Sequence, residues 1–142
     1  MLFRSAHDVR WRESFGSLSF DHAAGRVGHA TVYDLASLTK PIATLSIVLR
    51  LLEEGQLRLD APVASHVPGW RGADRTQVTL QDLLEHASGL PARLADAQPD
   101  GRDAFEQAIC DTPLAYAPRT RSIYSDLGLY SVDEIDDWNA LP

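Results

Sequence analysis

The sequence predicts an α+β fold in which a short strand region precedes a mostly helical remainder. Residues 9–20 alternate apolar and polar side chains with the period of two that is typical of half-buried strands. Residues 37–54 instead carry apolar side chains on most sides of a helix, and shorter helical patterns follow. A length of 142 residues allows one ordinary domain.

Composition excludes several classes of function. The formal net charge is −7 and no run of Lys or Arg occurs, which disfavours a nucleic-acid surface or a basic membrane-surface helix. The longest apolar stretch, residues 42–52, is interrupted by polar residues and is shorter than the ~18 residues of a membrane span. Cys110 is the only cysteine, so an internal disulfide and a Cys-based zinc site are excluded. Charged residues follow the initiator too soon for a signal peptide, and we expect a cytoplasmic chain as written.

The N-terminal alternation predicts a β-hairpin. Val9, Trp11 and Phe15 form the apolar side of its first strand, and Leu18 and Phe20 continue the pattern after a glycine. A polar loop is expected over the residues that follow.

The long apolar helix is expected to begin near Ser37 and to end before Gly55. Pro41 is compatible with this only in the first turn, and glycine readily adopts the left-handed conformation that ends a helix. Because apolar side chains lie on most of its sides, we expect the helix to be buried within something larger.

The next seventy residues predict short helices joined by loops. Residues 57–69 mix apolar residues with prolines and glycine, which favours irregular structure on the surface. Residues 79–82 have the pattern of a helix capping box, with a short helix directly after Thr79. Another short helix is expected over residues 104–110, and residues 131–142 are acidic and interpreted as a solvated tail.

Ser37 and Lys40 are the first candidates for chemistry. Their spacing of three places both side chains on one helical face, roughly 5–6 Å apart at Cβ. Lys40 is the only lysine among 13 basic residues, and only lysine, not arginine, can lose its proton and act as a base. Burial and the helix dipole would lower its pKa and let it activate the serine. The alternative is a polar helix start with a capping serine and a solvated lysine.

Tyr124 and Asp126 form the second candidate pair. The phenol of Tyr124 can donate a proton to a leaving group, or act as a base when deprotonated near cations. Taken alone, this Tyr-Ser-Asp sequence is more typical of a turn around a packed tyrosine than of a catalytic site.

Four segments together resemble the penicillin-recognising serine hydrolases, a family of class C β-lactamases, low-molecular-weight DD-peptidases and related esterases. The first contains the Ser-x-x-Lys signature of the wider superfamily. They occur in the family's order and spacing, at residues 33–40, 52–62, 83–91 and 124–128.

The resemblance implies a fold, a reaction and roles. The fold is part of the β-lactamase/transpeptidase-like fold, an antiparallel sheet with a helical subdomain, with most sheet strands absent. The activity is that of a serine hydrolase acting through an acyl-enzyme on a β-lactam, a D-Ala peptide or a small ester. Ser37 is the implied nucleophile, Lys40 takes its proton, Tyr124 protonates the leaving group, and Asp126 orients the lysine and substrate. The Ser37 N–H forms half of the oxyanion hole.

The resemblance also divides the chain and names its partners. His86 and Ser88 are implied to be structural residues of a turn. No cofactor or metal is implied, and the expected partner is a small-molecule or peptide substrate. Full-length relatives can be exported. Self-association of this chain is possible through uncovered apolar surface. The implied regions are an N-terminal hairpin of the α/β part at 1–34, the nucleophile helix at 35–56, a helical subdomain segment at 57–130, and a non-family acidic tail at 131–142.

Two departures from the family pattern support a second hypothesis. The family's third motif, Lys-Thr-Gly or His-x-Gly, is absent after Tyr124. Arg119 occupies a position where the family usually has a turn glycine, and a positive φ would strain it. We therefore also consider an inactive truncated remnant.

Overall fold

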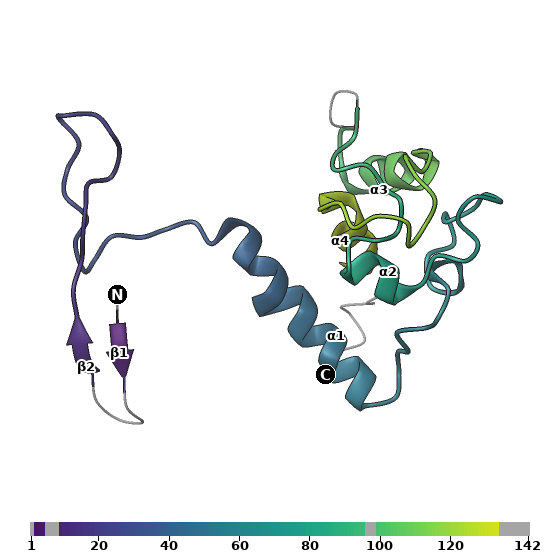
Figure 1. Ribbon diagram of the computed structural model, residues 1–142, viewed down its shortest axis with the longest axis horizontal. Helices are drawn as coiled ribbons and strands as arrows, with labels where there is room; N and C mark the ends of the chain where they lie inside the picture. Colours follow the sequence, from purple (N-terminus) through teal and green to yellow (C-terminus); the bar gives the residue numbers. More distant parts are fainter. Residues whose placement is uncertain (1, 5–8, 96–98, 134–142) are drawn as a thin grey trace. The chain divides into compact units, whose positions relative to one another are not determined.

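The computed structural model describes residues 2–4, 9–95 and 99–133. The chain divides into two compact units, residues 1–36 and residues 37–142. In the described part, no helix has the length and apolar character needed to cross a membrane. Among these residues the structure has helices and a single two-stranded sheet, so the α+β class is present with few strands (Figure 1).

The first unit contains that sheet. Strand β1 (Leu2–Arg4) pairs antiparallel with β2 (Val9–Arg12), with Phe3 opposite Trp11. The strand expected at residue 9 is present, but its expected partner at residues 18–20 is wrong. Residues 16–27 instead fold back on themselves, with Leu18 donating to the Gly25 carbonyl at 2.9 Å and Gly16 at φ 86°. Gly16 turns the chain before a second ladder forms, and Leu18 and Phe20 are left exposed.

The second unit begins with the expected long helical run, but the run has three geometries. A 3-10 turn (Ala36–Leu38) and a π-helical turn (Lys40–Thr44) precede helix α1 (Leu45–Glu53). Leu45 donates to the Lys40 carbonyl, and the Pro41 carbonyl instead accepts from Ser46 Oγ at 3.4 Å. Gly55 at φ 72° follows the helix end, as expected.

The residues after α1 confirm one expectation only in part. Residues 57–78 are irregular apart from the 3-10 turn Val63–Ser65 and most of them are exposed, but several apolar side chains of the segment belong to the core. Val63 and Trp70 are buried, and the Trp70 indole donates to the Arg75 carbonyl at 3.2 Å. The prolines and glycine set the irregular path, while burial of the apolar side chains decides which face is inside.

Arg75 ties this irregular segment to helix α3 (Arg102–Asp111). Its guanidinium is 3% exposed and donates to the carbonyls of Cys110 and Thr112 at 2.7 and 2.6 Å. These carbonyls lie at the end of α3, where the last turn leaves acceptors without helical partners. Arg75 therefore satisfies the C-terminal end of a helix more than thirty residues away.

Helix α2 (Leu80–Leu84) starts at the capping box that the sequence predicts. Thr79 Oγ1 accepts from the Asp82 N–H at 3.3 Å, and Asp82 Oδ2 accepts from the Thr79 N–H at 2.9 Å. The short helix expected after Thr79 is present, and His86, at φ 56°, is the first residue beyond it in the left-handed conformation.

Helix α4 (Asp126–Asp133) packs against both α2 and α3 (Figure 1). The helix extends three residues into the expected acidic tail, and Ser131 and Val132 are buried. Residues 134–142 of that tail lie outside the described residues.

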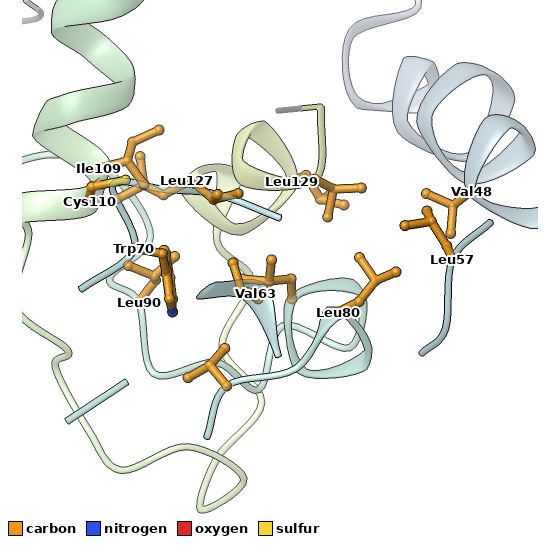
Figure 2. Close-up of a cluster of buried hydrophobic side chains, with 14 of the residues drawn as sticks. Val48, Leu57, Val63, Trp70, Leu80, Leu90, Ile109, Cys110, Leu127 and Leu129 are labelled. Carbon is orange, nitrogen blue, oxygen red and sulfur yellow. The ribbon is translucent and has the colours of Figure 1, made fainter. Parts of the chain in front are cut away.

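One hydrophobic core joins these elements (Figure 2). Its members come from α1, the irregular segment, α2, α3 and α4. They include Val48, Leu57, Val63, Trp70, Leu80, Leu90, Ile109, Cys110, Leu127 and Leu129. This core fixes the start of α4 relative to the end of α2.

Candidate active site

Ser37 lies in the 3-10 turn that opens the helical run. Its side chain is exposed, and the preceding residue, Ala36, has φ 44°, in the left-handed region. A non-glycine residue in this region costs about 1 kcal/mol, so the turn before Ser37 is strained. The first N–H groups of a helical run have no intrahelical partner and point toward the turn's opening. The first of these, the Ala36 N–H, donates to Asp34 Oδ1 at 2.8 Å.

Lys40 lies one helical turn beyond Ser37. Its Nζ donates to Ser37 Oγ at 3.2 Å and forms an ion pair with Asp126 Oδ1 at 2.8 Å. The two side chains of this ion pair are 25% and 29% exposed. The first residue of α4 thus holds the lysine that faces the serine.

The ion pair sets the charge of both partners. The hydrogen bond to Asp126, followed by one to Tyr124, raises the pKa of Lys40 above its ordinary value, although burial opposes the shift. The hydrogen bond from Lys40 likewise lowers the pKa of Asp126. The sequence analysis expected burial and the helix dipole to lower the Lys40 pKa. That expectation is wrong for this arrangement, because the carboxylate outweighs the small desolvation of a partly exposed amine.

Tyr124 is the fourth member of this group. Its phenol oxygen donates to Ser37 Oγ at 2.9 Å, and Lys40 Nζ lies 5.4 Å from the centre of its ring. Ser37 Oγ therefore lies within hydrogen-bond distance of two proton-carrying groups that are 84 residues apart in sequence. The structure brings together all four residues that the sequence singled out.

The loop that carries Tyr124 is held by the turn after α2. Ser125 Oγ donates to the Pro91 carbonyl at 2.7 Å, and the Asp126 N–H donates to the Ala92 carbonyl at 3.2 Å. Ser122 Oγ donates to the Glu85 carbonyl at 2.8 Å. The end of α2 and the turn that follows it thus fix the path of the Tyr124 loop, although neither contains a candidate nucleophile.

The other residues discussed from the sequence, Ser88 and Arg119, make no contact with these four candidates among the described interactions. Ser88 is 1% exposed and its Oγ accepts from the Leu90 N–H at 3.3 Å, as a turn residue would. Arg119 does adopt a positive φ, 65°, and its guanidinium donates to the Gln77 carbonyl at 2.8 Å. Over the described ranges, no three His, Cys, Asp or Glu side chains gather to hold a metal ion.

Sequence reasoning missed the contacts of His86. Its ring packs against the Tyr124 ring, with centroids 4.6 Å apart, and its Nδ1 accepts from the Ser125 N–H at 3.2 Å. The only sequence signal was its position in a segment that resembles the family, which indicated a structural turn residue. Its contact with the candidate site depends on tertiary packing.

Comparison with known proteins identifies one family model. The beta-lactamase model matches residues 8–135, which is most of the chain and includes all four candidate residues.

Curated relatives carry three kinds of hydrolase name. A protein of Escherichia coli (strain K12) named "Putative D-alanyl-D-alanine carboxypeptidase" is 35% identical over 68% of this chain and 26% of its own length. "Esterase EstB" of Burkholderia gladioli is 36% identical over 74% of this chain and 32% of its own. "N-acetylmuramyl-L-alanine amidase" of Bacillus subtilis (strain 168) is 32% identical over 69% and 25%. The matches span no more than about a third of these relatives.

Proposed function

The chain belongs to the beta-lactamase family of serine hydrolases, and on that premise we propose that it forms an acyl-enzyme on Ser37. The observation that carries the proposal is the position of Ser37 Oγ, 3.2 Å from Lys40 Nζ and 2.9 Å from the Tyr124 phenol. A serine hydroxyl is a weak nucleophile until an adjacent group accepts its proton. Both neighbours here are groups that can exchange one.

The reaction takes place at an ester or amide carbonyl. Ser37 Oγ forms a bond to the carbonyl carbon while its proton passes to the amine of Lys40, and the carbonyl oxygen takes the displaced electron pair. The Ser37 N–H, at the start of the helical run, supports that oxyanion. The bond to the leaving alcohol or amine then breaks, Tyr124 protonates the departing atom, and the Lys40 ammonium returns a proton to Tyr124. Water then adds to the carbonyl carbon of the serine ester and gives one proton to the amine of Lys40. The bond from that carbon to Ser37 Oγ breaks, Lys40 returns the proton to Ser37 Oγ, and the acid leaves.

Lys40 must first release a proton before it can serve as this base. In the ion pair with Asp126, the ammonium donates to Ser37 instead of accepting from it. We therefore expect the reaction to be faster at alkaline pH, where the neutral amine is more populated.

The substrate class follows the kinds of carbonyl named for the relatives. A D-Ala peptide, a β-lactam and a small ester all present an acyl carbon to a serine. The site is open, with Tyr124 49% exposed and Ser37 also exposed.

A chain without catalysis is the second candidate function. It is favoured by the raised pKa of Lys40, which keeps the amine 3.2 Å from Ser37 Oγ as a proton donor and not an acceptor. An inactive member of the family would keep the same fold and bind without turning over.

Covalent labelling separates the two candidates. The folded chain is incubated with a fluorophosphonate and, separately, with a fluorescent penicillin, and the adduct is located by peptide mass spectrometry. We expect labelling at Ser37 that Ser37→Ala abolishes. Ser46→Ala is the matched control, because Ser46 is an exposed serine on the same helical run and its variant should label normally. A folded chain that neither probe labels would show that the non-catalytic candidate is correct.

A further inference from the structure

We propose that His86 is a positioning residue that aims the Tyr124 phenol at Ser37. The proposal rests on the function proposed above and extends it to a residue that the family resemblance placed only in a turn. It is carried by contacts between His86 and three consecutive residues of the Tyr124 loop.

The backbone and the side chain of His86 hold both neighbours of Tyr124. The His86 carbonyl accepts from the Ile123 N–H at 3.0 Å. Its ring nitrogen Nδ1 accepts from the Ser125 N–H at 3.2 Å. The backbone N–H groups of both residues that flank Tyr124 therefore donate to a single residue.

The ring of His86 supports Tyr124 itself. The two ring centroids are 4.6 Å apart with the planes tilted by 40°, a packed arrangement. On its other side, the phenol donates to Ser37 Oγ at 2.9 Å. The tyrosine is held between the imidazole and the serine, and a change of its χ1 rotamer would break both contacts.

The backbone conformation of His86 makes these contacts possible. At φ 56° its chain reverses directly after α2, so that the carbonyl and the side chain both face the Tyr124 loop. Histidine and asparagine tolerate this left-handed conformation better than most residues. Nδ1 can accept only if the ring proton is on Nε2, so a neutral imidazole of one tautomer is required.

Two substitutions at position 86 distinguish the effect of the hydrogen-bond acceptor from the effect of ring packing against Tyr124. Asparagine at position 86 retains an acceptor oxygen near the place of Nδ1 and tolerates the positive φ. Phenylalanine retains a ring against Tyr124 but has no acceptor, and it leaves the Ser125 N–H without its partner.

The experiment measures the rate of Ser37 labelling by a fluorophosphonate in the full chain. For His86→Phe we expect the rate to fall about 10-fold to 100-fold, since a small misplacement of a catalytic group costs this much. For His86→Asn we expect a rate close to that of the wild type. His66→Phe is the matched control, because the described contacts join His66 to Val63 and not to the site. Equal rates for His86→Phe and wild type, or equal losses in both His86 variants, would overturn the proposal.

A second measurement does not depend on activity. In the ¹⁵N-labelled wild type we expect a scalar coupling across the hydrogen bond between the Ser125 amide nitrogen and His86 Nδ1. We also expect a nuclear Overhauser contact between the Tyr124 ring and the Ser37 β-protons, kept in His86→Asn and lost in His86→Phe.

These signals distinguish the two proposals. If wild type is not labelled but the coupling and the contact pattern are seen, the proposed function fails and the positioning role stands. If the coupling is absent from folded wild type, the positioning role is wrong, whatever the labelling shows and even if His86→Phe fails to fold.

Discussion

Asp126 controls the proton of Lys40 through one ion pair. Its carboxylate, 2.8 Å from Nζ, raises the pKa of Lys40, so the amine stays charged to a higher pH than an isolated lysine. In Asp126→Asn the charged partner is lost and the Lys40 pKa falls. We expect the pH at which Ser37 labelling is half-maximal to move to lower pH in this variant, because the neutral amine forms earlier.

The measurement is the labelling rate between pH 6 and pH 11 in buffers of constant ionic strength. Asp74→Asn is a suitable control, since Asp74 pairs with Arg75 and not with the site. A midpoint that does not move in Asp126→Asn would show that Lys40 is not the group that accepts the serine proton.

Arg119 carries a backbone strain that its side chain offsets. The residue has φ 65°, while its guanidinium donates to the Gln77 carbonyl and lies 3.5 Å from the buried carboxylate of Asp82. Arg119→Ala loses these contacts and keeps the strained φ, whereas Arg119→Gly loses the contacts and removes the strain. We therefore expect the glycine variant to be more stable than the alanine variant by about 1 kcal/mol.

Urea unfolding of both Arg119 variants, followed by far-UV circular dichroism, gives this difference. A lower free energy of unfolding for Arg119→Gly than for Arg119→Ala would mean that the positive φ costs the chain nothing.

The proximity of the four candidate residues could be predicted from the sequence, but their charge state could not. Ser37 and Lys40 are one helical turn apart, so spacing alone places them together. Tyr124 joined them only through the family resemblance, because nothing local connects residues so distant. The pKa of Lys40 depends on Asp126, the first residue of α4, lying 2.8 Å from its amine. The packed core determines that position, and no local sequence pattern does. The role proposed for His86 depends on tertiary contacts in the same way.

Helix α2 leads into the turn that holds the Tyr124 loop, and the capping box of α2 determines where the helix begins. Thr79 Oγ1 and the carboxylate of Asp82 each accept the other's backbone N–H, and Asp82 is 3% exposed. Thr79→Ala removes one of these acceptors, and we expect it to lower the free energy of unfolding by about 1 kcal/mol. Thr79→Ser keeps the hydroxyl and should cost much less.

Thermal or urea unfolding of the two Thr79 variants provides the test. Because α2 leads into the turn that holds the Tyr124 loop, Thr79→Ala should also speed amide exchange at Ser125. Equal stability of the alanine and serine variants would contradict a role for the cap.

Elements with local signals were predicted, and elements defined by distant contacts were not. The capping box of α2 and the helix near residues 104–110 follow from a few neighbouring residues, and both are present. The partner of the strand at residue 9 is chosen by pairing, which the alternating pattern does not specify. The burial of the apolar side chains within residues 57–78 likewise depends on Arg75 and Trp70 meeting the end of α3.

The second unit presents an apolar stripe along its first helical run. We define this stripe as the side chains of Leu38, Ile42, Leu45 and Leu49, which recur every three or four residues on one helical face. All four are between 38% and 59% exposed. The opposite face supplies Val48 and Leu51 to the core. From the apolar side chains on most of its sides we expect this helix to be buried. Among the described residues, only the side that faces the core is buried.

An exposed stripe of this kind should bind apolar probes and favour self-association. We expect Leu49→Gln to reduce the binding of a hydrophobic dye and to shift the mass measured by light scattering toward the monomer, with little change in stability. Leu51→Gln, two residues further on, is the matched control: Leu51 is 6% exposed, so burying its amide without a partner should destabilise the chain. Urea unfolding and sedimentation of both variants separate the two effects. If Leu49→Gln unfolds the chain as readily as Leu51→Gln, then the stripe is covered in solution, and its leucines belong to the interior of the molecule.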